Sequence, residues 1–462
     1  MKKINRRKFI KQSTFTTAAI SAGQLTKAFE PTMRPQNAQY MGGFPAPPLE
    51  RPRIAMIGVG ARGSAHLKYL AKLGDCDIVA ISDLFEDLAV RGANMCHEVG
   101  QGKNHQHIKT YHGGENEWRK MLKEVSPDVV FISTNWSNHA PMAIESMEND
   151  AHAFVEVPIA LTIDEMWDIV NTSERTKRHC MMMENVNYNR DELMFLHMCR
   201  QGVIGELLHG EAAYLHELKW QMGEVKRGTG SWRTNHYANR NGNLYPTHGL
   251  GPIAQYMNLG RTEDTFKSLV SYSSPARGRS QYSKKEYPKG HQWNKLNFKG
   301  GDINTSIIKT YQGRTILVQW DETSPRPYSR LNLIQGTKGI LAGFPTRVAL
   351  EGGVDGITDD HHQWVEGDQL KMVYEKYDHP LYKRLNAKTK GSGHGGMDGM
   401  MLFRIIECLK NGWPLDQNVY EGCFWSSVAP LSEKSVAEDG APQTFPDFTR
   451  GDWKNTIPLV YQ

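Results

Sequence analysis

The sequence predicts an α/β protein with two parts, an N-terminal doubly wound parallel sheet and a second α+β domain with a large open, mainly antiparallel sheet. Three observations predict this class. Short apolar strands alternate with helical segments in the first half, and a glycine-rich turn follows the first strand directly. In the second half the pattern changes to strands that alternate apolar and polar residues. With 462 residues, the chain is long enough for two domains.

The first half alternates strands with helices. The predicted strands are residues 53–57, 76–82, 128–133, 152–156 and 180–184. The predicted helices are residues 64–73, 86–98, 116–124, 142–149 and 163–175. Because parallel neighbours need a crossover connection, which is usually a helix, this order predicts a parallel sheet covered on both faces.

The second half predicts an antiparallel sheet with one covered face. Its predicted strands are residues 208–216, 268–273, 305–311, 315–320 and 331–335, and its predicted helices are residues 193–200, 397–411 and 421–434. Long stretches rich in glycine, asparagine and aromatic residues separate them, above all residues 223–251, which we interpret as a functional loop. The expected organisation is a signal segment (1–30), a linker (31–52), a nucleotide-binding domain (53–186), a substrate-binding domain (187–450) and a tail (451–462).

The N-terminus carries the basic character of the chain. Its Asn-Arg-Arg-Lys-Phe run at residues 5–9 resembles a twin-arginine export motif, followed by a weakly apolar stretch at residues 13–23. We therefore expect export to the periplasm or another extracytoplasmic site, and the alternative is a disordered basic tail. Removing the seven basic residues of this segment from the formal charge of +5 leaves −2. A nearly neutral chain of mixed charge gives no electrostatic footprint for nucleic acid, and no other segment is typical of a membrane span.

Cysteines and histidines do not predict a metal site. The six cysteines are scattered without CxxC or zinc-like spacing, so most are expected to be buried thiols. The pairs Asp359-Asp360 and His361-His362, and His394 further on, do not stand at a recognised ligand spacing.

A glycine motif predicts a dinucleotide site in the first domain. Gly58, Gly60 and Gly63 form GxGxxG between the first strand and the first helix. The first glycine allows the tight turn, the second lets the backbone approach the pyrophosphate, and the third packs helix on strand. Asp83 ends the next strand, twenty residues past Gly63, where a carboxylate binds the ribose hydroxyls. Because it would repel a 2′-phosphate, we predict NAD rather than NADP in this Rossmann domain.

Two further strand ends point to the same crevice. Asn135, Trp136 and His139 follow the strand at 128–133, and Glu156 ends the strand at 152–156. Ligands of open α/β sheets bind beyond the carboxyl ends of the strands, so we assign these residues to the NAD site. The alternatives are that Trp136 belongs to the core and that His139 caps a helix.

These motifs resemble those of the glucose–fructose oxidoreductase and inositol dehydrogenase family. That family carries a Glu-Lys-Pro motif whose lysine serves the substrate hydroxyl, and here the motif reads Glu156-Val157-Pro158. Its second domain carries an aspartate and a histidine where this chain reads Gly-Asn-Leu-Tyr-Pro-Thr-His-Gly, at residues 242–249. Both departures count against a simple dehydrogenase.

The same departures resemble glycoside hydrolase family 109, the NAD-dependent α-N-acetylgalactosaminidases. The shared motifs are Gly-Val-Gly-Ala-Arg-Gly, Asn-Trp-Ser-Asn-His, Glu-Val-Pro and Asn-Leu-Tyr-Pro-Thr-His-Gly. The resemblance implies NAD contacts from Arg62, Gly63, Asp83, Trp136, His139, Glu156, Val157 and Asn185. It implies a sugar pocket lined by Tyr214, Arg233, Tyr245, Pro246, Thr247, His248 and Tyr328.

The chemistry that this resemblance implies is a redox-neutral cleavage of terminal α-linked N-acetylgalactosamine with retention. Oxidation at sugar C3, elimination across C1 and C2, addition of water and reduction would follow one another. Among the residues, His248 is the first catalytic candidate, because histidine side chains exchange protons near neutral pH, and Tyr245 and Tyr188 are the further candidates. A tyrosine base requires a lowered pKa, for which we expect Arg233 to supply the charge.

Two other functions stay open at this stage. The first alternative is a conventional NAD-dependent sugar or polyol dehydrogenase, which the fold alone would suggest. The second is a catalytically silent sugar-binding protein. The exposed sheet face of the second domain would also allow a homo-oligomer.

Overall fold

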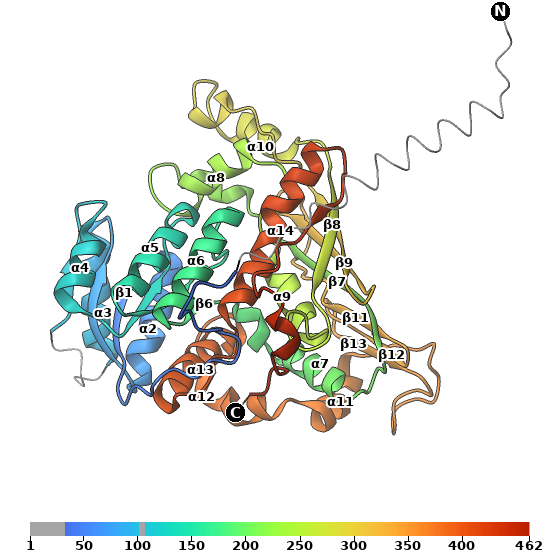
Figure 1. The fold of residues 1–462 in the computed structure, drawn as a ribbon. Helices are drawn as coiled ribbons and strands as arrows, with labels where there is room; N and C mark the ends of the chain where they lie inside the picture. The colour runs from blue at the N-terminus through green and yellow to red at the C-terminus, as the bar shows by residue number, and fades with distance from the viewer. Residues whose placement is uncertain (1–32, 101–106, 462) are drawn as a thin grey trace, which may run out of the picture.

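The computed structural model describes residues 33–100 and 107–461 (Figure 1). The expected signal segment, residues 1–30, lies outside the described residues. Among the helices of the described ranges, none is long and apolar enough to cross a membrane.

The first sheet has six parallel strands in the order β3-β2-β1-β4-β5-β6. Its strands are β1 (Arg53–Ile57), β2 (Asp77–Ser82), β3 (Lys109–Tyr111), β4 (Val129–Ile132), β5 (His152–Val155) and β6 (Cys180–Met182). The crossover helices are α2 (Ala61–Leu73), α3 (Glu86–Val99), α4 (Glu117–Val125), α5 (Trp136–Glu148) and α6 (Ile163–Thr176). Every residue of β4 and β5 is buried, because helices cover both faces of the sheet. The predicted Rossmann fold is confirmed, and β3 is an edge strand that the sequence analysis missed.

One helix of this domain begins earlier than predicted. α5 starts at Trp136 instead of residue 142, so Trp136 and His139 lie in its first turns. Pro141 lies inside the helix, where its missing N–H and its ring normally break helical structure. That proline explains why the sequence pattern placed the start too late.

The second sheet has nine strands in the order β14-β13-β12-β11-β7-β10-β9-β8-β15. The pair β7 and β10 is parallel, and the other neighbours are antiparallel. The strands are β7 (Leu207–Leu215), β8 (Phe266–Ser273), β9 (Asn304–Thr310), β10 (Thr315–Asp321), β11 (Leu333–Gly336), β12 (Gly339–Ala342), β13 (Arg347–Leu350), β14 (Val365–Glu366) and β15 (Gln443–Thr444). Burial alternates along β8 and β9, as expected for a sheet with one covered face. This agrees with the predicted open, mainly antiparallel sheet.

The predicted loop at residues 223–251 is wrong in part. It contains α8 (Thr229–Asn239) and the start of α9 (Thr247–Tyr256). Gly249 lets α9 lie directly on β7, since a Cβ there would come within 2.2 Å of the Ala213 nitrogen. The glycines thus serve close packing, and tertiary contact stabilises helices that local propensity does not favour.

The remaining helices complete the second half. They are η1 (Asn185–Tyr188), α7 (Arg190–Arg200), η2 (Lys219–Gly223), α10 (Gly278–Glu286), η3 (Gln292–Lys295), η4 (Gly367–Gln369), α11 (Leu370–Tyr377), α12 (Pro380–Thr389), η5 (His394–Gly396), α13 (Met397–Asn411), α14 (Val419–Ala437) and η6 (Asp452–Asn455). The two C-terminal helices return to the first domain. α13 lies beside α2 and shares a buried apolar cluster with β1, and α14 packs on α6, β6 and β8 (Figure 1). The two sheets are therefore joined through a common core rather than by a linker.

Candidate active site

A cavity of about 1270 Å³ opens where the carboxyl ends of the first sheet face the second domain. Its wall combines the turn after β1, the ends of β2, β4 and β5, and residues of β7, η2, α8 and α9. This is the crevice in which open α/β sheets bind ligands. The volume exceeds the usual 300–1,000 Å³ or so of a small-molecule site, so the cavity has room for a dinucleotide and a second small molecule.

The glycine turn has the backbone that a dinucleotide requires. Gly58 has φ +85°, and a Cβ on Gly63 would lie 2.0 Å from the Gly58 oxygen. A Cβ on Gly60 would meet open space, at the N-terminus of α2. The Asp83 carboxylate accepts from the nitrogens of Val59 (2.8 Å) and Phe85 (3.0 Å), which fixes it at the end of β2. Gly60 thus leaves the space that a pyrophosphate needs.

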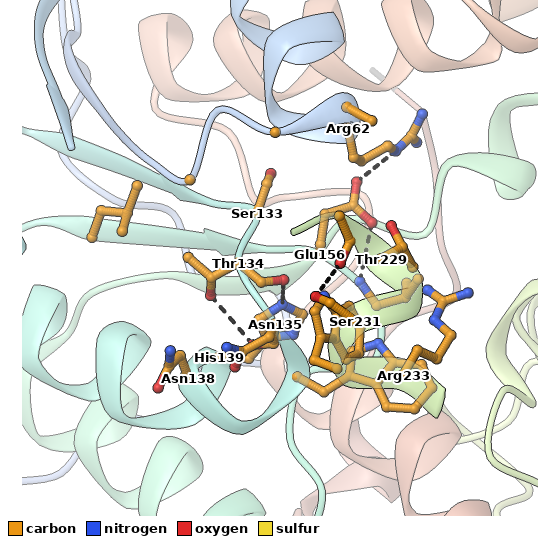
Figure 2. A pocket seen from close by; sticks show the side chains of 18 of the residues that line it. Arg62, Ser133, Thr134, Asn135, Asn138, His139, Glu156, Thr229, Ser231 and Arg233 are labelled. Atoms are coloured by element: carbon orange, nitrogen blue, oxygen red, sulfur yellow. Dashed lines mark hydrogen bonds and ion pairs between the residues drawn. The ribbon is translucent and has the colours of Figure 1, made fainter. Parts of the chain in front are cut away.

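Unpaired polar atoms in the cavity wall also fit a polar cofactor. Ser133 Oγ, Asn135 Oδ1 and Asn185 Oδ1 are buried and find no hydrogen-bond partner within the described residues. Such atoms are costly unless a ligand or water satisfies them. Figure 2 draws Ser133 and Asn135 together with Ser231 and Arg233 of α8 around one pocket, so groups from both domains line it.

His139 holds two segments of this wall together. Its ring nitrogens lie 2.7 Å from the Pro158 oxygen and 3.2 Å from the Thr134 oxygen. Burial lowers the pKa of His139, and the neutral ring carries a single N–H, so it donates to one of these two carbonyl oxygens and only contacts the other. His139 therefore shapes the loops on either side of the cavity rather than moving protons.

An ion-pair network connects the cofactor turn to α13. Arg62 contacts Glu156 (Nε to Oε1, 2.8 Å) and Asp398 (Nη1 to Oδ2, 2.7 Å), as Figure 2 shows for Glu156. Glu156 also pairs with His66 at 2.6 Å, and Asp398 pairs with His394 at 2.7 Å. Burial opposes ionisation of both carboxyl groups. Even so, Arg62 and His66 hold the pKa of Glu156 well below its usual range. His394 and Arg62 do the same for the pKa of Asp398. Both carboxylates are therefore ionised and committed to ion pairs.

This network makes a prediction about acid stability. Asp398→Asn is expected to lower the free energy of unfolding by roughly 3 kcal/mol at pH 7, because it removes one partner of a largely buried pair. The folded pKa lies below the unfolded value of about 3.9, so the contribution is complete above about pH 4 and is lost as the pH falls further. Denaturant titrations of the wild type and of Asp398→Asn at pH 7 and pH 3 measure their free energies of unfolding. A difference between the two proteins that stays constant down to pH 3 would contradict a lowered pKa of Asp398.

The segment between η2 and α8 of the second domain, which contains Arg227, lies over the part of the cavity that the glycine turn lines. Arg227 pairs with Asp87 of α3 (3.0 and 2.8 Å), and its guanidinium lies 4.8 Å from the centre of the Phe85 ring. Arg227 and Phe85 both line the cavity, and Phe85 lies two residues past Asp83. The segment therefore covers the side of the cavity where Asp83 is expected to bind a ribose.

Arg227→Ala is expected to release the bound nucleotide about threefold faster, since exposed ion pairs and cation–π contacts are individually weak. The rate of dissociation is measured by diluting the holoprotein and recording the fluorescence of the nucleotide that stays bound. Arg175→Ala is the matched control, because Arg175 forms an exposed ion pair with Glu148 on the first domain, outside the cavity. An equal acceleration in both variants would count against a role for Arg227.

The predicted sugar residues converge on the other half of the cavity. Tyr214 lies between Tyr245, His248 and Tyr328, with ring centres 4.7, 5.3 and 6.0 Å away. Arg233 packs its guanidinium 4.9 Å from the ring centre of Trp136 and 5.2 Å from that of Tyr245. All of these side chains line the same cavity as the glycine turn. Lining residues that the sequence analysis did not assign to the site include His216, Leu218, Trp220, Trp232, Arg330, His394 and Met397.

The expected tyrosine with a lowered pKa is not found among the described residues, although Arg233 acts in the expected direction. Burial raises the pKa of Tyr245 above its usual range, and Arg233 opposes this shift without cancelling it. The pKa of Tyr214 is likewise raised well above its usual range by burial, with Tyr245 and Glu322 adding to the effect. Both phenols therefore stay protonated and are suited to donate hydrogen bonds, not to accept protons.

His248 is held by a carboxylate that the sequence analysis missed. Its Nδ1 lies 2.6 Å from Oε1 of Glu184, which is completely buried. The His248 side chain keeps 15% of its surface exposed and lines the cavity. Glu184 follows β6 and stands next to the predicted residue Asn185, and this adjacency was the available signal.

Four predicted site residues lie outside the cavity wall. Gly63 is one of them, and it packs α2 against the turn after β1, where an added Cβ would lie 2.0 Å from the Gly58 oxygen. Tyr188 is buried in the core, where its hydroxyl donates to Asp416 at 3.1 Å, so it is not a catalytic residue. Pro246 and Thr247 are buried at the start of α9 and position the flanking Tyr245 and His248 without lining the cavity.

The residues considered for a metal site lie in two different places. Asp360, His361 and His362 are exposed and hold their ligand atoms within 4.8 Å of one another, away from the cavity. His394 instead lines the cavity and pairs with Asp398. The six cysteines are free, and five of them are buried.

Family models match both halves of the chain. Residues 52–184 match the model of the oxidoreductase family with an NAD-binding Rossmann fold, which agrees with the predicted cofactor, NAD. Residues 188–455 match the model of the glycosyl hydrolase 109 C-terminal domain.

Relatives match over the whole length. Glycosyl hydrolase family 109 protein 1 of Akkermansia muciniphila is 56% identical over 98% of both chains. A glycosyl hydrolase family 109 protein of Shewanella putrefaciens is 50% identical over 99% of both chains. Among solved structures, an NAD-binding oxidoreductase from Klebsiella pneumoniae has a TM-score of 0.64 at 16% identity, covering 86% of this chain and 99% of its own. Levoglucosan dehydrogenase in complex with NADH and levoglucosan has a TM-score of 0.62 at 18% identity, covering 86% and 100%. These two structures share the fold.

Proposed function

Because the chain belongs to glycoside hydrolase family 109, we propose that it is an NAD-dependent α-N-acetylgalactosaminidase that cleaves terminal α-linked N-acetylgalactosamine with retention. The observation that carries this proposal is the composition of one cavity wall. An NAD turn and a histidine–tyrosine pocket share the cavity, and Val157 stands where a dehydrogenase of this fold keeps a lysine. The wall thus supports redox chemistry on a sugar, but it lacks the lysine that serves the substrate hydroxyl in the dehydrogenases of this fold.

The protonation state of each side chain decides the role that we assign to it. Bound NAD would accept a hydride from sugar C3 while the proton of the C3 hydroxyl leaves to water, and the ketone so formed would acidify the proton on C2. His248 accepts that proton, since histidine exchanges protons near neutral pH. Tyr245 and Tyr214 stay protonated and donate hydrogen bonds to the sugar and the leaving oxygen. Glu156 is ion-paired with Arg62 and His66 and orients the cofactor turn.

We also propose export by the twin-arginine route, on the basis of Arg6 and Arg7 and the basic start of the chain. This route carries folded proteins, so the nucleotide is bound before export. A redox-neutral cycle then needs no supply of fresh NAD. The contacts of Arg227 over the nucleotide half suit such retention.

The test uses purified protein without added nucleotide and a chromogenic α-N-acetylgalactosaminide. Release of the aglycone over many turnovers, with no net gain of NADH absorbance, is the expected result. The matching β-anomer and the α-glucosaminide serve as specificity controls. Accumulation of NADH from added NAD and free sugar, with the glycoside untouched, would contradict the proposal and favour a dehydrogenase.

A further inference from the structure

We propose that Glu184 is a positioning residue that keeps the proton of neutral His248 on Nδ1, so that Nε2 is the atom that takes the substrate proton. The catalytic half of this inference rests on the proposed function, and the tautomer itself does not. Glu184 does not line the cavity, so it acts through the histidine.

The geometry holds the carboxylate against one nitrogen of the ring. Glu184 follows β6 of the first sheet, and His248 lies in the first turn of α9 in the second domain. Oε1 of Glu184 is 2.6 Å from Nδ1 of His248. Gly251, on the same helix, packs so closely that an added Cβ would lie 3.0 Å from Cγ of Glu184. Gln417 donates to the backbone oxygen of Glu184 at 3.0 Å, which fixes the strand end.

The electrostatics assign the proton between the two groups. Glu184 has no exposed surface, and within the described ranges its only ion-pair partner is His248. Its Oε2 is buried without a hydrogen-bond partner, and its other side-chain contact is a long one from the Val186 nitrogen at 3.4 Å. In this assignment Glu184 accepts, as a carboxylate does, and the hydrogen in the 2.6 Å contact belongs to the imidazole. A buried carboxylate needs such a donor, because losing it leaves an uncompensated charge.

The tautomer of His248 determines which ring nitrogen can accept a proton. With Nδ1–H directed to Glu184, the lone pair of neutral His248 is on Nε2. The titratable groups that face the ring are Tyr214 and Tyr245, with ring centres 5.3 and 5.0 Å away, and His216, which contacts the Tyr214 hydroxyl. Since both phenols stay protonated, neither competes with Nε2 for the proton.

The kinetic test is Glu184→Gln in the full-length, NAD-containing protein. A glutamine amide can donate to Nδ1 and stabilise the opposite tautomer, so kcat is expected to fall by about 10²–10³-fold. KM for the galactosaminide and the bound NAD are expected to stay within about twofold, since binding contacts are untouched. Glu421→Gln is the matched control, because Glu421 is equally buried and paired, with Arg261, but lies outside the cavity. It is expected to lower the Tm and to keep kcat.

A spectroscopic test separates this inference from the proposed function. In ¹⁵N-histidine-labelled protein above neutral pH, His248 is expected to show a protonated Nδ1 and an unprotonated Nε2, identified by the signals that His248→Asn removes. Glu184→Gln is expected to change that pattern. An Nε2–H tautomer in the wild type, an unchanged kcat in Glu184→Gln, or a kcat loss that follows loss of NAD would overturn the inference. If the wild type cleaves no galactosaminide, the proposed function fails, and the tautomer still decides the positioning role.

Discussion

Replacing His248 with alanine is expected to lower kcat for a galactosaminide by about 10³-fold while the protein keeps its NAD. General acid–base groups typically contribute 10²–10⁴-fold, roughly, and the neighbouring phenols of Tyr214 and Tyr245 stay protonated by burial. Neither phenol is therefore suited to replace His248 as the proton acceptor. Steady-state kinetics, with the nucleotide measured after denaturation, give both quantities.

His209→Ala is the control for this variant. His209 lies on β7 like Tyr214, but it bonds to Thr315 and lies outside the cavity, so its replacement is expected to leave kcat unchanged. A His248→Ala protein with kcat within about threefold of the wild type would exclude His248 as the proton acceptor.

Gly60→Val is expected to yield a folded protein that has lost nearly all bound NAD, with affinity at least about tenfold weaker. Gly60 has φ −63°, which valine adopts, and an added Cβ there meets no protein atom within 4 Å. The open space is where the pyrophosphate approaches the backbone, so the isopropyl group excludes the cofactor rather than the fold. Nucleotide content, Tm without nucleotide and glycosidase activity are measured together.

Gly290→Val gives the matched control, because Gly290 also faces open space and lies outside the cavity. It is expected to keep NAD and activity. A Gly60→Val protein that retains stoichiometric NAD would show that the dinucleotide does not cross this turn.

The parts of the fold that follow local patterns could be predicted from the sequence. The alternation of strands and helices, the glycine turn and Asp83 are set by neighbouring residues, and the structure has each of them as expected. The helix at residues 397–411 has the predicted bounds, because its apolar period is uninterrupted and Gly412 ends it in a left-handed conformation.

The parts that depend on distant contacts could not be predicted. α8 and α9 form in a glycine-rich stretch because Gly249 lies against the β7 backbone, which no local signal reveals. Asp398 reaches Arg62 across more than 300 residues of chain. The pKa of a tyrosine depends on its burial, so the sequence indicated Tyr245 as a site residue but wrongly led us to expect a lowered pKa for it.

The central claim is cleavage through a C3 ketone and loss of the C2 proton, and the most direct test is the reaction in D₂O. The released N-acetylgalactosamine is analysed by ¹H NMR and mass spectrometry. Our account predicts one deuterium at C2 of the released sugar, because the proton that His248 removes exchanges with solvent before it returns. A released sugar that keeps its original C2 hydrogen would contradict the elimination route and indicate direct hydrolysis.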